Sequence, residues 1–144
     1  MSRQERLIIS CVCLAAFTFQ FEAFLINVAL PSMAIELRAS STAISFAVLS
    51  YLLATTITLV PAGNLGDRFG LRRTFLCGCA LATIGTLLSG LSTELYMLLA
   101  CRFLQGLGIG SIVANAYAMI PLWISKEHTG RSYGMLSLGA GVGM

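Results

Sequence analysis

The chain has 144 residues, of which 57% are hydrophobic and 10% are charged, and its formal net charge is +3. Soluble domains carry about a quarter charged residues, and a soluble fold of this length could not bury so much apolar surface. The expected solvent is therefore a lipid bilayer, and the small net charge argues against a nucleic-acid partner.

Four apolar segments of membrane-spanning length follow one another along the chain, and a fifth begins near its end. A membrane helix needs roughly 20 consecutive apolar residues, and lipid offers backbone polar groups no partner outside the helix. The expected fold is all-α and integral to the membrane, with four complete transmembrane helices and the start of a fifth in one partial bundle. The expected helices cover residues 7–30, 43–62, 74–91, 96–124 and 133–144.

The first segment, residues 7–30, follows two basic residues, Arg3 and Arg6, and we expect Pro31 to end it. This arrangement also fits a secretory signal peptide. The apolar run is longer than the hydrophobic part of such a peptide, and further spans follow it. A membrane helix is therefore the favoured interpretation.

Glu22 is the one charged residue inside the first segment. An ionisable group in a span costs several kcal/mol unless it faces a cavity or a partner. Eight residues separate Glu22 from Leu30, which is about 12 Å of helix. A glutamate side chain does not comfortably reach the outer interface over that distance, although such snorkelling is the alternative. We therefore expect a buried carboxyl that can exchange a proton.

The second segment carries a polar stripe of Tyr51, Thr55 and Thr58, at the i, i+4, i+7 spacing of one helix face. These side chains could line a polar pathway. Hydroxyl groups in a helix also bond back to the carbonyl groups of their own helix. The spacing alone leaves both interpretations open.

A charged connection, GNLGDRFGLRRTFL at residues 63–76, joins the second and third segments. Glycine permits close backbone approach and unusual dihedral angles, so we expect a tight turn. Asp67 either caps this turn or acts as a switch that holds a helix end or an arginine in one conformation and releases it in another. The candidate residues of this connection are Gly63, Asp67, Arg68, Gly70, Arg72 and Arg73, and Gly66 is a further glycine of the turn.

The fourth segment contains Arg102, about 9 Å from the outer end of its helix at 1.5 Å per residue. Glu22 is expected at a comparable depth, so we expect the two charges to be coupled directly or through water. The alternative is that the long arginine side chain reaches the outer interface. Gln105 lies on the same broad face as Arg102, and Gly106 and Gly110 form a small-xxx-small pair typical of close helix packing.

The basic residues outside the spans give the orientation. Seven Lys and Arg residues lie in the N-terminal tail and the two connections on the same side, whereas Arg38 alone lies on the other side. By the positive-inside rule, the N-terminus and the charged connection face the cytoplasm. The seven residues are Arg3, Arg6, Arg68, Arg72, Arg73, Lys126 and Arg131.

The charged connection resembles the loop signature of the major facilitator superfamily, G-x-L-a-D-r-x-G-r-k. Leu71 departs from this pattern, because a basic residue is usual at its position, and Arg73 adds a charge nearby. In that family the loop gates the change between inward-open and outward-open states. The matching residues are Gly63, Leu65, Asp67, Arg68, Gly70 and Arg72.

Two further stretches resemble patterns of the same family. LLACRFLQGLGIG, residues 98–110, is similar to its fourth-helix pattern, l-x-x-x-R-x-x-q-G-x-g. FEAFLINVALP, residues 21–31, is similar to the first-helix pattern of fourteen-helix drug:proton antiporters, l-D-x-t-i-v-N-v-A-l-P, with Glu22 in place of Asp and Phe24 in place of Thr. The final stretch resembles the start of the antiporters' fifth-helix motif. The matching residues are Leu98, Arg102, Gln105, Gly106 and Gly108 in the fourth helix, and Asn27, Val28, Ala29, Leu30 and Pro31 in the first.

The resemblance implies a multi-pass transporter of the cell membrane that exports drugs or other lipophilic or cationic small molecules by alternating access, with protons as the coupling ion and the remaining helices of the same transporter as partners. The implied coupling site and substrate cavity contain Glu22, Asn27, Arg102 and Gln105. The alternatives are an importer or a metabolite exporter of the same superfamily, and a membrane sensor or scaffold that transports nothing.

Enzymatic chemistry is not expected, because the sequence offers no nucleophile–base pair, no zinc spacing and no phosphate-cradling loop. No cofactor and no metal are expected. Two C-x-C pairs lie in apolar segments, but residues i and i+2 of a helix point about 200° apart and cannot easily chelate one ion. An odd number of cysteines in apolar surroundings argues against a disulfide framework. The cysteines, interpreted as packing residues, are Cys11, Cys13, Cys77, Cys79 and Cys101.

Overall fold

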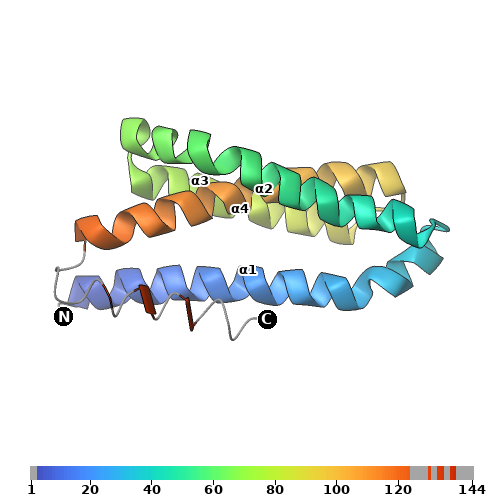
Figure 1. The fold of residues 1–144 in the computed structure, drawn as a ribbon, viewed down its shortest axis with the longest axis horizontal. Helices are drawn as coiled ribbons and strands as arrows, with labels where there is room; N and C mark the ends of the chain where they lie inside the picture. The colour runs from blue at the N-terminus through green and yellow to red at the C-terminus, as the bar shows by residue number, and fades with distance from the viewer. Residues whose placement is uncertain (1–2, 124–129, 131–132, 135–136, 139–144) are drawn as a thin grey trace. The chain divides into compact units, whose positions relative to one another are not determined.

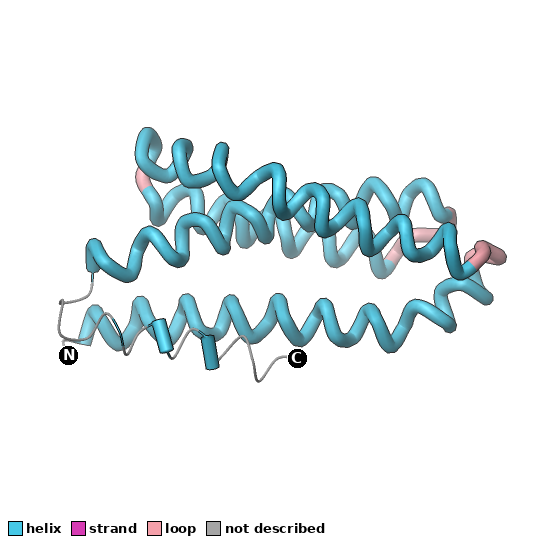
Figure 2. The backbone as a smooth tube through the Cα atoms, viewed as in Figure 1, coloured by secondary structure: helices cyan, strands magenta, loops and turns pink. Residues whose placement is uncertain are grey.

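The computed structural model describes residues 3–123, 130, 133–134 and 137–138. This part of the chain is helical and contains no strand (Figures 1 and 2), so the all-α prediction is confirmed. Of the helices described, α2, α3 and α4 are long and apolar enough to cross a membrane. Helix α1 covers the first predicted span, whereas most of the fifth, residues 133–144, lies outside the described residues. The helices are α1, Arg3–Glu36; α2, Ser41–Phe69; α3, Leu71–Gly90; and α4, Leu95–Trp123.

The chain forms two compact units. One consists of residues 29–115, which include the end of α1, all of α2 and α3, and most of α4. The other consists of residues 1–28 and 116–144. The candidate residues on α2, α3 and α4 thus belong to the first of these units, and Glu22 and Asn27 belong to the second.

Helix α1 does not end at Pro31, so that prediction is wrong. The helix continues to Glu36, with Pro31 inside it. The residues after the proline explain the continuation, because Met33, Ala34 and Leu37 pack against a buried cluster of Ile44, Ala47 and Leu98. Proline removes one backbone donor, and burial of an apolar helix face offsets this loss.

The end of α1 is closed by Arg38, whose φ of 48° is in the left-handed region. The N–H of Ala39 donates to the carbonyl of Ala34 at 3.0 Å, and the N–H of Arg38 donates to that of Ile35 at 3.2 Å. This pair of bonds is a Schellman motif, which satisfies the last carbonyl groups of a helix. Ala39 packs against the same buried cluster as Ala34, so the turn and the cluster support each other.

The charged connection is mostly helix. Helix α2 begins after Ser40, whose hydroxyl caps it by accepting from the N–H of Ala43 at 3.2 Å, and it ends at Phe69. Residues 63–69 therefore lie in the last turns of α2, which extends beyond its predicted end at residue 62, and the predicted tight turn is confined to Gly70. A single residue, Gly70, separates α2 from α3.

Gly70 makes this one-residue turn possible. Its φ and ψ are 98° and 127°, a backbone conformation that residues other than glycine rarely adopt. Its N–H donates to the carbonyl of Gly66 at 2.9 Å, and its own carbonyl accepts from the N–H groups of Arg73 and Thr74, each at 3.1 Å. One residue thus ends α2 and starts α3.

Helix α4 lies against the backbones of both α2 and α3, and Figures 1 and 2 show the three helices side by side. On one side, Gly106 and Gly110 contact α2, where a Cβ added at Gly110 would lie 2.6 Å from the carbonyl oxygen of Thr55. On the other side, a Cβ at Gly78 of α3 would lie 2.9 Å from the carbonyl oxygen of Gly108. The predicted close packing by Gly106 and Gly110 is confirmed.

The unit of residues 1–28 and 116–144 contains a contact at the proline of α4. Pro121 has no N–H, so it cannot bond to the carbonyl of Tyr117 one turn earlier. The hydroxyl of Tyr133 donates to that carbonyl at 3.4 Å, and the two tyrosine rings stack with centroids 6.0 Å apart. A side chain thus takes the place of the missing backbone donor.

We expect Gly70→Ala to lower the free energy of unfolding by about 1–2 kcal/mol, because a Cβ strains a residue with positive φ. Gly63→Ala is the matched control. Gly63 lies inside α2 with no atom within 4 Å of its added Cβ, so alanine there should leave stability unchanged or raise it by up to about 1 kcal/mol. Thermal unfolding of the two purified variants measures both effects, and an equal change in both would contradict the strained turn.

Candidate functional site

A buried chain of polar groups joins α4 to α3. Arg102 is 6% exposed and Gln105 is 0% exposed, although both lie in a helix of membrane-spanning length. Nη1 of Arg102 donates to Oε1 of Gln105 at 2.9 Å, and Nε2 of Gln105 donates to Oγ1 of Thr86 at 3.0 Å. The Thr86 hydroxyl donates in turn to the carbonyl of Ala82 at 2.9 Å. The predicted pair Arg102 and Gln105 is therefore in direct contact, with Thr86 as a further member.

The local sequence explains this contact. Arg102 and Gln105 are three residues apart, so they lie on one face of α4. Gly85 brings α3 close to that face, because a Cβ added there would lie 2.7 Å from the backbone nitrogen of Gln105. The next residue, Thr86, is then within hydrogen-bond distance of the Gln105 amide. Arg102 is 6% exposed and bonded to Gln105, which disfavours the alternative of a side chain extended away from the helices.

The polar stripe of α2 faces α4. The hydroxyls of Thr55 and Thr58 donate to the carbonyls of Tyr51 and Ala54 in their own helix, at 2.9 and 2.7 Å. A Cβ added at Gly110 would lie 2.8 Å from Cβ of Thr58. The stripe therefore forms part of the packed interface with α4, as the second interpretation expects, and a role in lining a pathway stays a prediction.

Glu22 and Asn27 lie on α1 in the other compact unit. Glu22 is half-buried, and the side chain of Asn27 lies outside the described part of the chain. The expected coupling of Glu22 with Arg102 joins residues of the two units and stays a prediction.

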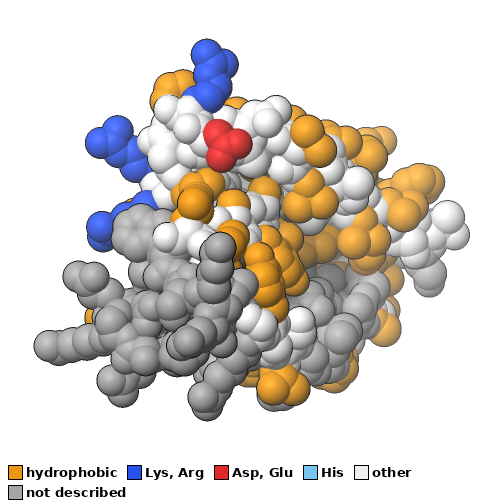
Figure 3. Space-filling view, turned by 60° about the vertical axis from the view of Figure 1, so that its left-hand side comes forward, with side chains coloured by type: hydrophobic (Ala, Val, Ile, Leu, Met, Phe, Trp, Pro, Cys, Tyr) orange, Lys and Arg blue, Asp and Glu red, His pale blue; other side chains and the backbone are white. Residues whose placement is uncertain are grey.

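The charged residues around Gly70 are all exposed. Asp67 and Arg68 lie in the last turn of α2, and Arg72 and Arg73 lie in the first turn of α3. Figure 3 shows basic side chains that project from the surface, with an acidic one close by. Among the residues that the structure describes, no ion pair joins Asp67 to an arginine. These charges are thus accessible to groups outside the described helices.

Asn115 of α4 lies against the same end of α2. The residue is 0% exposed, and its Nδ2 donates to the carbonyls of Ser111 at 2.7 Å and Ala62 at 3.4 Å. Its Oδ1 is buried and accepts no hydrogen bond from the described residues. This oxygen occupies the space in which a Cβ of Gly66 would stand, so Gly66 and Asn115 fit together only because Gly66 has no side chain.

Neither Thr86 nor Asn115 was predicted from the sequence. Both are polar residues inside apolar segments, and this is the one sequence feature that could have identified them as candidates. Threonine in a helix usually bonds to its own backbone, so this signal was weak for Thr86. The structural role of Asn115 depends on its contact with α2, which the sequence does not show.

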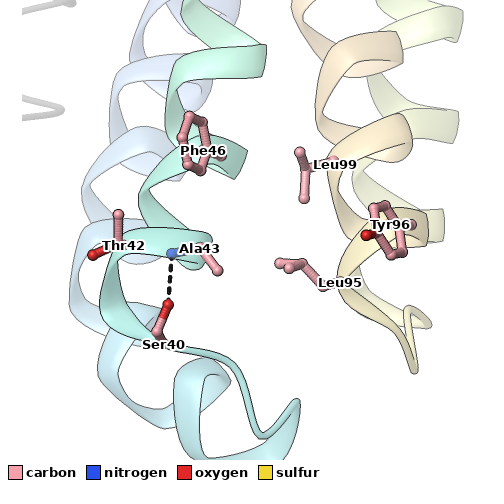
Figure 4. Close-up of a pocket in the computed structure, with 7 residues that line it drawn as sticks. All are labelled: Ser40, Thr42, Ala43, Phe46, Leu95, Tyr96 and Leu99. Atoms are coloured by element: carbon pink, nitrogen blue, oxygen red, sulfur yellow. Dashed lines mark hydrogen bonds between the residues drawn. The ribbon is translucent and has the colours of Figure 1, made fainter.

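A pocket of about 310 Å³ lies between the beginnings of α2 and α4. Figure 4 shows Phe46 of α2 on one side of it and Leu95 and Leu99 of α4 on the other. The lining has no carboxyl and no basic group, so this pocket is not a candidate coupling site. Its lining residues are Ser40, Thr42, Ala43, Phe46, Leu95, Tyr96 and Leu99.

The five cysteines are free thiols, and Cys101 alone among them is buried. The described residues contain no group of three or more His, Cys, Asp or Glu side chains that could hold a metal ion.

Residues 12–144 match the sequence model of the Major Facilitator Superfamily. The chain belongs to the major facilitator superfamily. As a member of this superfamily, it is a multi-pass membrane protein of a family of transport proteins and not of enzymes. The Arg102–Gln105 pair lies in the stretch that resembles the fourth-helix pattern, and Gly70 lies in the stretch that resembles the loop signature.

Several curated members of the superfamily are similar to the chain. An uncharacterized transporter of Mycobacterium tuberculosis is 40% identical over 79% of this chain and 16% of its own length. The riboflavin transporter RibZ of Clostridioides difficile is 25% identical over 98% of this chain and 31% of its own length. The multidrug resistance protein Stp of M. tuberculosis is 29% identical over 83% of this chain and 22% of its own length. The chain thus spans a third or less of the length of these relatives.

The contact between Gly66 and Asn115 predicts a suppressor pair. Gly66→Ala should lower the free energy of unfolding by about 1–3 kcal/mol, because the added methyl group overlaps Oδ1 of Asn115. Asn115→Ala removes this oxygen, so the double variant should recover most of the loss. The measurement is a double-mutant cycle in thermal unfolding. Additive effects of the two substitutions would show that the side chains do not meet.

Proposed function

We propose that the chain is part of a secondary active transporter that exports lipophilic or cationic small molecules in exchange for protons, by alternating access. Membership of the superfamily supports transport, and the remaining helices of the same transporter would complete the pathway. The observation that carries the coupling hypothesis is Arg102, a 6% exposed cation inside a helix of membrane-spanning length. A buried charge of this kind marks a substrate or proton pathway by default.

The proposed coupling group is Glu22, with Arg102 as its partner across the substrate cavity and with Asn27 and Gln105 beside them. A cation near a carboxylate offsets part of the cost of burying both charges in lipid. Protonation of Glu22 would remove its charge and change this balance, so a proton and a cationic substrate would compete for the same site. Tyr51, Thr55 and Thr58 are proposed to line the pathway in another conformation.

The class of substrate has two candidates. The similarity to the multidrug resistance protein Stp and to the first-helix pattern of drug antiporters favours a lipophilic cation. The similarity to the riboflavin transporter RibZ over nearly the whole chain favours a metabolite such as a flavin. A sensor or scaffold would move neither compound.

The function is tested with inside-out membrane vesicles that contain the full-length carrier. Ethidium and riboflavin are the two probes, and an acidic vesicle interior supplies the driving force. The parent should concentrate one of them, Glu22→Gln should abolish this accumulation and retain exchange of labelled for unlabelled probe, and Glu22→Asp should retain part of it. Glu36→Gln, an exposed carboxyl at the end of α1, is the control and should behave as the parent.

Two results would count against this proposal. If Glu22→Gln still concentrates the probe under a proton gradient, Glu22 is not the coupling group. If the parent moves neither probe under any gradient, export of either class of substrate is wrong, and the sensor or scaffold becomes the better hypothesis.

We further propose that the segment around Gly70 gates the conformational change, with Asp67, Arg68, Arg72 and Arg73 as its charged groups. These side chains are exposed, so they can contact other helices of the carrier in one state and release them in another. Asp67→Asn in the full-length carrier should slow transport at least about tenfold, the equivalent of about 1.4 kcal/mol, and leave probe binding near the parent value. Equal losses of binding and transport would argue against gating.

The proposed location is the plasma membrane with the N-terminus in the cytoplasm, supported by the seven-to-one bias of basic residues. Asn64→Cys, in a carrier without the native cysteines, should react with an impermeant thiol reagent only after the membrane is opened. Thr93→Cys, between α3 and α4, is the matched control and should react in intact cells, because both positions are exposed. Labelling of Asn64→Cys in intact cells would reverse the topology.

A further inference from the structure

We propose that Thr86 of α3 is a positioning residue for Arg102, and that it acts through the amide of Gln105. This proposal rests on the proposed function, in which Arg102 belongs to the coupling site. The three side chains form a chain of hydrogen bonds in which Thr86 determines which end of the amide faces the cation.

The direction of each bond follows from the donors and acceptors. A threonine hydroxyl has one hydrogen, and Thr86 gives it to the carbonyl of Ala82 at 2.9 Å. Toward α4, Thr86 therefore presents an oxygen that accepts. The amide of Gln105 must turn its NH₂ group to this oxygen, and the contact is 3.0 Å.

This orientation of the Gln105 amide determines which of its atoms contacts Arg102. With its NH₂ group directed to Thr86, Gln105 presents its Oε1 to Nη1 of Arg102 at 2.9 Å. A guanidinium group has donors and no acceptor, so the carbonyl end of the amide suits it and the NH₂ end would repel it. The hydroxyl on α3 thus selects the favourable orientation of an amide on α4.

Removal of the Thr86 hydroxyl would remove this support from α3. Gln105 is 0% exposed, so its NH₂ group would lose the bond to Thr86 in an apolar environment, where the loss of a hydrogen bond is costly. The amide would then be held less firmly, and Arg102 would lose an acceptor of fixed position. A hydrogen bond to a charged group contributes about 1.5–3 kcal/mol to stability. Its loss changes an equilibrium constant about tenfold or more.

Thr83, one turn earlier on α3, shows what a threonine does without this role. Its hydroxyl also donates to its own helix, to the carbonyl of Cys79 at 2.8 Å, but the residue is exposed. The bond back to the helix is thus common to both threonines, and the contact with Gln105 distinguishes Thr86. Thr83→Val is therefore the matched control for Thr86→Val.

The decisive measurement is the ratio of gradient-driven accumulation to gradient-free exchange in vesicles that contain the full-length carrier, with ethidium or riboflavin as the probe. Valine has nearly the shape of threonine but no hydroxyl. Thr86→Val should therefore lower this ratio about tenfold, the change that corresponds to the loss of one hydrogen bond to a charged group. Thr86→Ser keeps the hydroxyl and should restore it, and Thr83→Val should leave it unchanged. If Thr86→Val lowers accumulation and exchange equally, or behaves as Thr83→Val, the positioning role is refuted.

A second measurement tests the contact without transport. Thermal unfolding of purified Thr86→Val, Gln105→Leu and the double variant should give non-additive effects, because each single substitution removes the same hydrogen bond between Gln105 and Thr86. Additive effects would overturn the proposal. If the parent shows no gradient-driven transport, the proposed function fails, and the cycle still decides whether Thr86 holds Gln105.

Discussion

Direct backbone contact between helices is the constraint on which the rest of this structure depends. Lipid is as apolar as a leucine side chain, so helices in a membrane associate through close packing and polar contacts and not through the hydrophobic effect. In this chain, α4 approaches α2 at Gly106 and Gly110 and approaches α3 at Gly78 and Gly85. At such short separations, side chains as short as threonine and asparagine reach a neighbouring helix.

Two buried polar contacts of α4, made by Gln105 and Asn115, use this proximity differently. Toward α3, every bond from Ala82 to Arg102 has a defined direction, so the chain of bonds holds a charged group in place. Toward α2, Asn115 is buried with one oxygen that has no partner among the described residues. Such an acceptor costs about 1–3 kcal/mol, so the packing of α4 against Gly66 is a compromise between fit and hydrogen bonding.

The sequence predicted the helices and the close packing of α4, because apolar length and glycine spacing are local signals. It failed where tertiary contacts override local ones. Pro31 does not end α1, because Met33, Ala34 and Leu37 beyond it pack against a buried cluster. Helix α2 continues past residue 62, where Ala62 and Gly66 contact Asn115 of α4. The roles of Thr86 and Asn115 depend on which helix faces them, and periodicity within one helix does not contain that information. Arg102 was predicted because it is a charge inside an apolar segment, and Gln105 because it lies three residues farther on the same face and both match the fourth-helix pattern.

The single-residue turn at Gly70 has a mechanical consequence. A long connection would let two helices tilt independently. Here a single residue with a glycine-specific geometry joins α2 to α3, so the two adjacent helix ends are held close together. The ends of α2 and α3 at this turn therefore cannot separate by more than one residue allows. Asn115 contacts Ala62 and Gly66 close to the turn, and Gln105 contacts Thr86 farther along α3, so both contacts are made with the two helices that Gly70 joins.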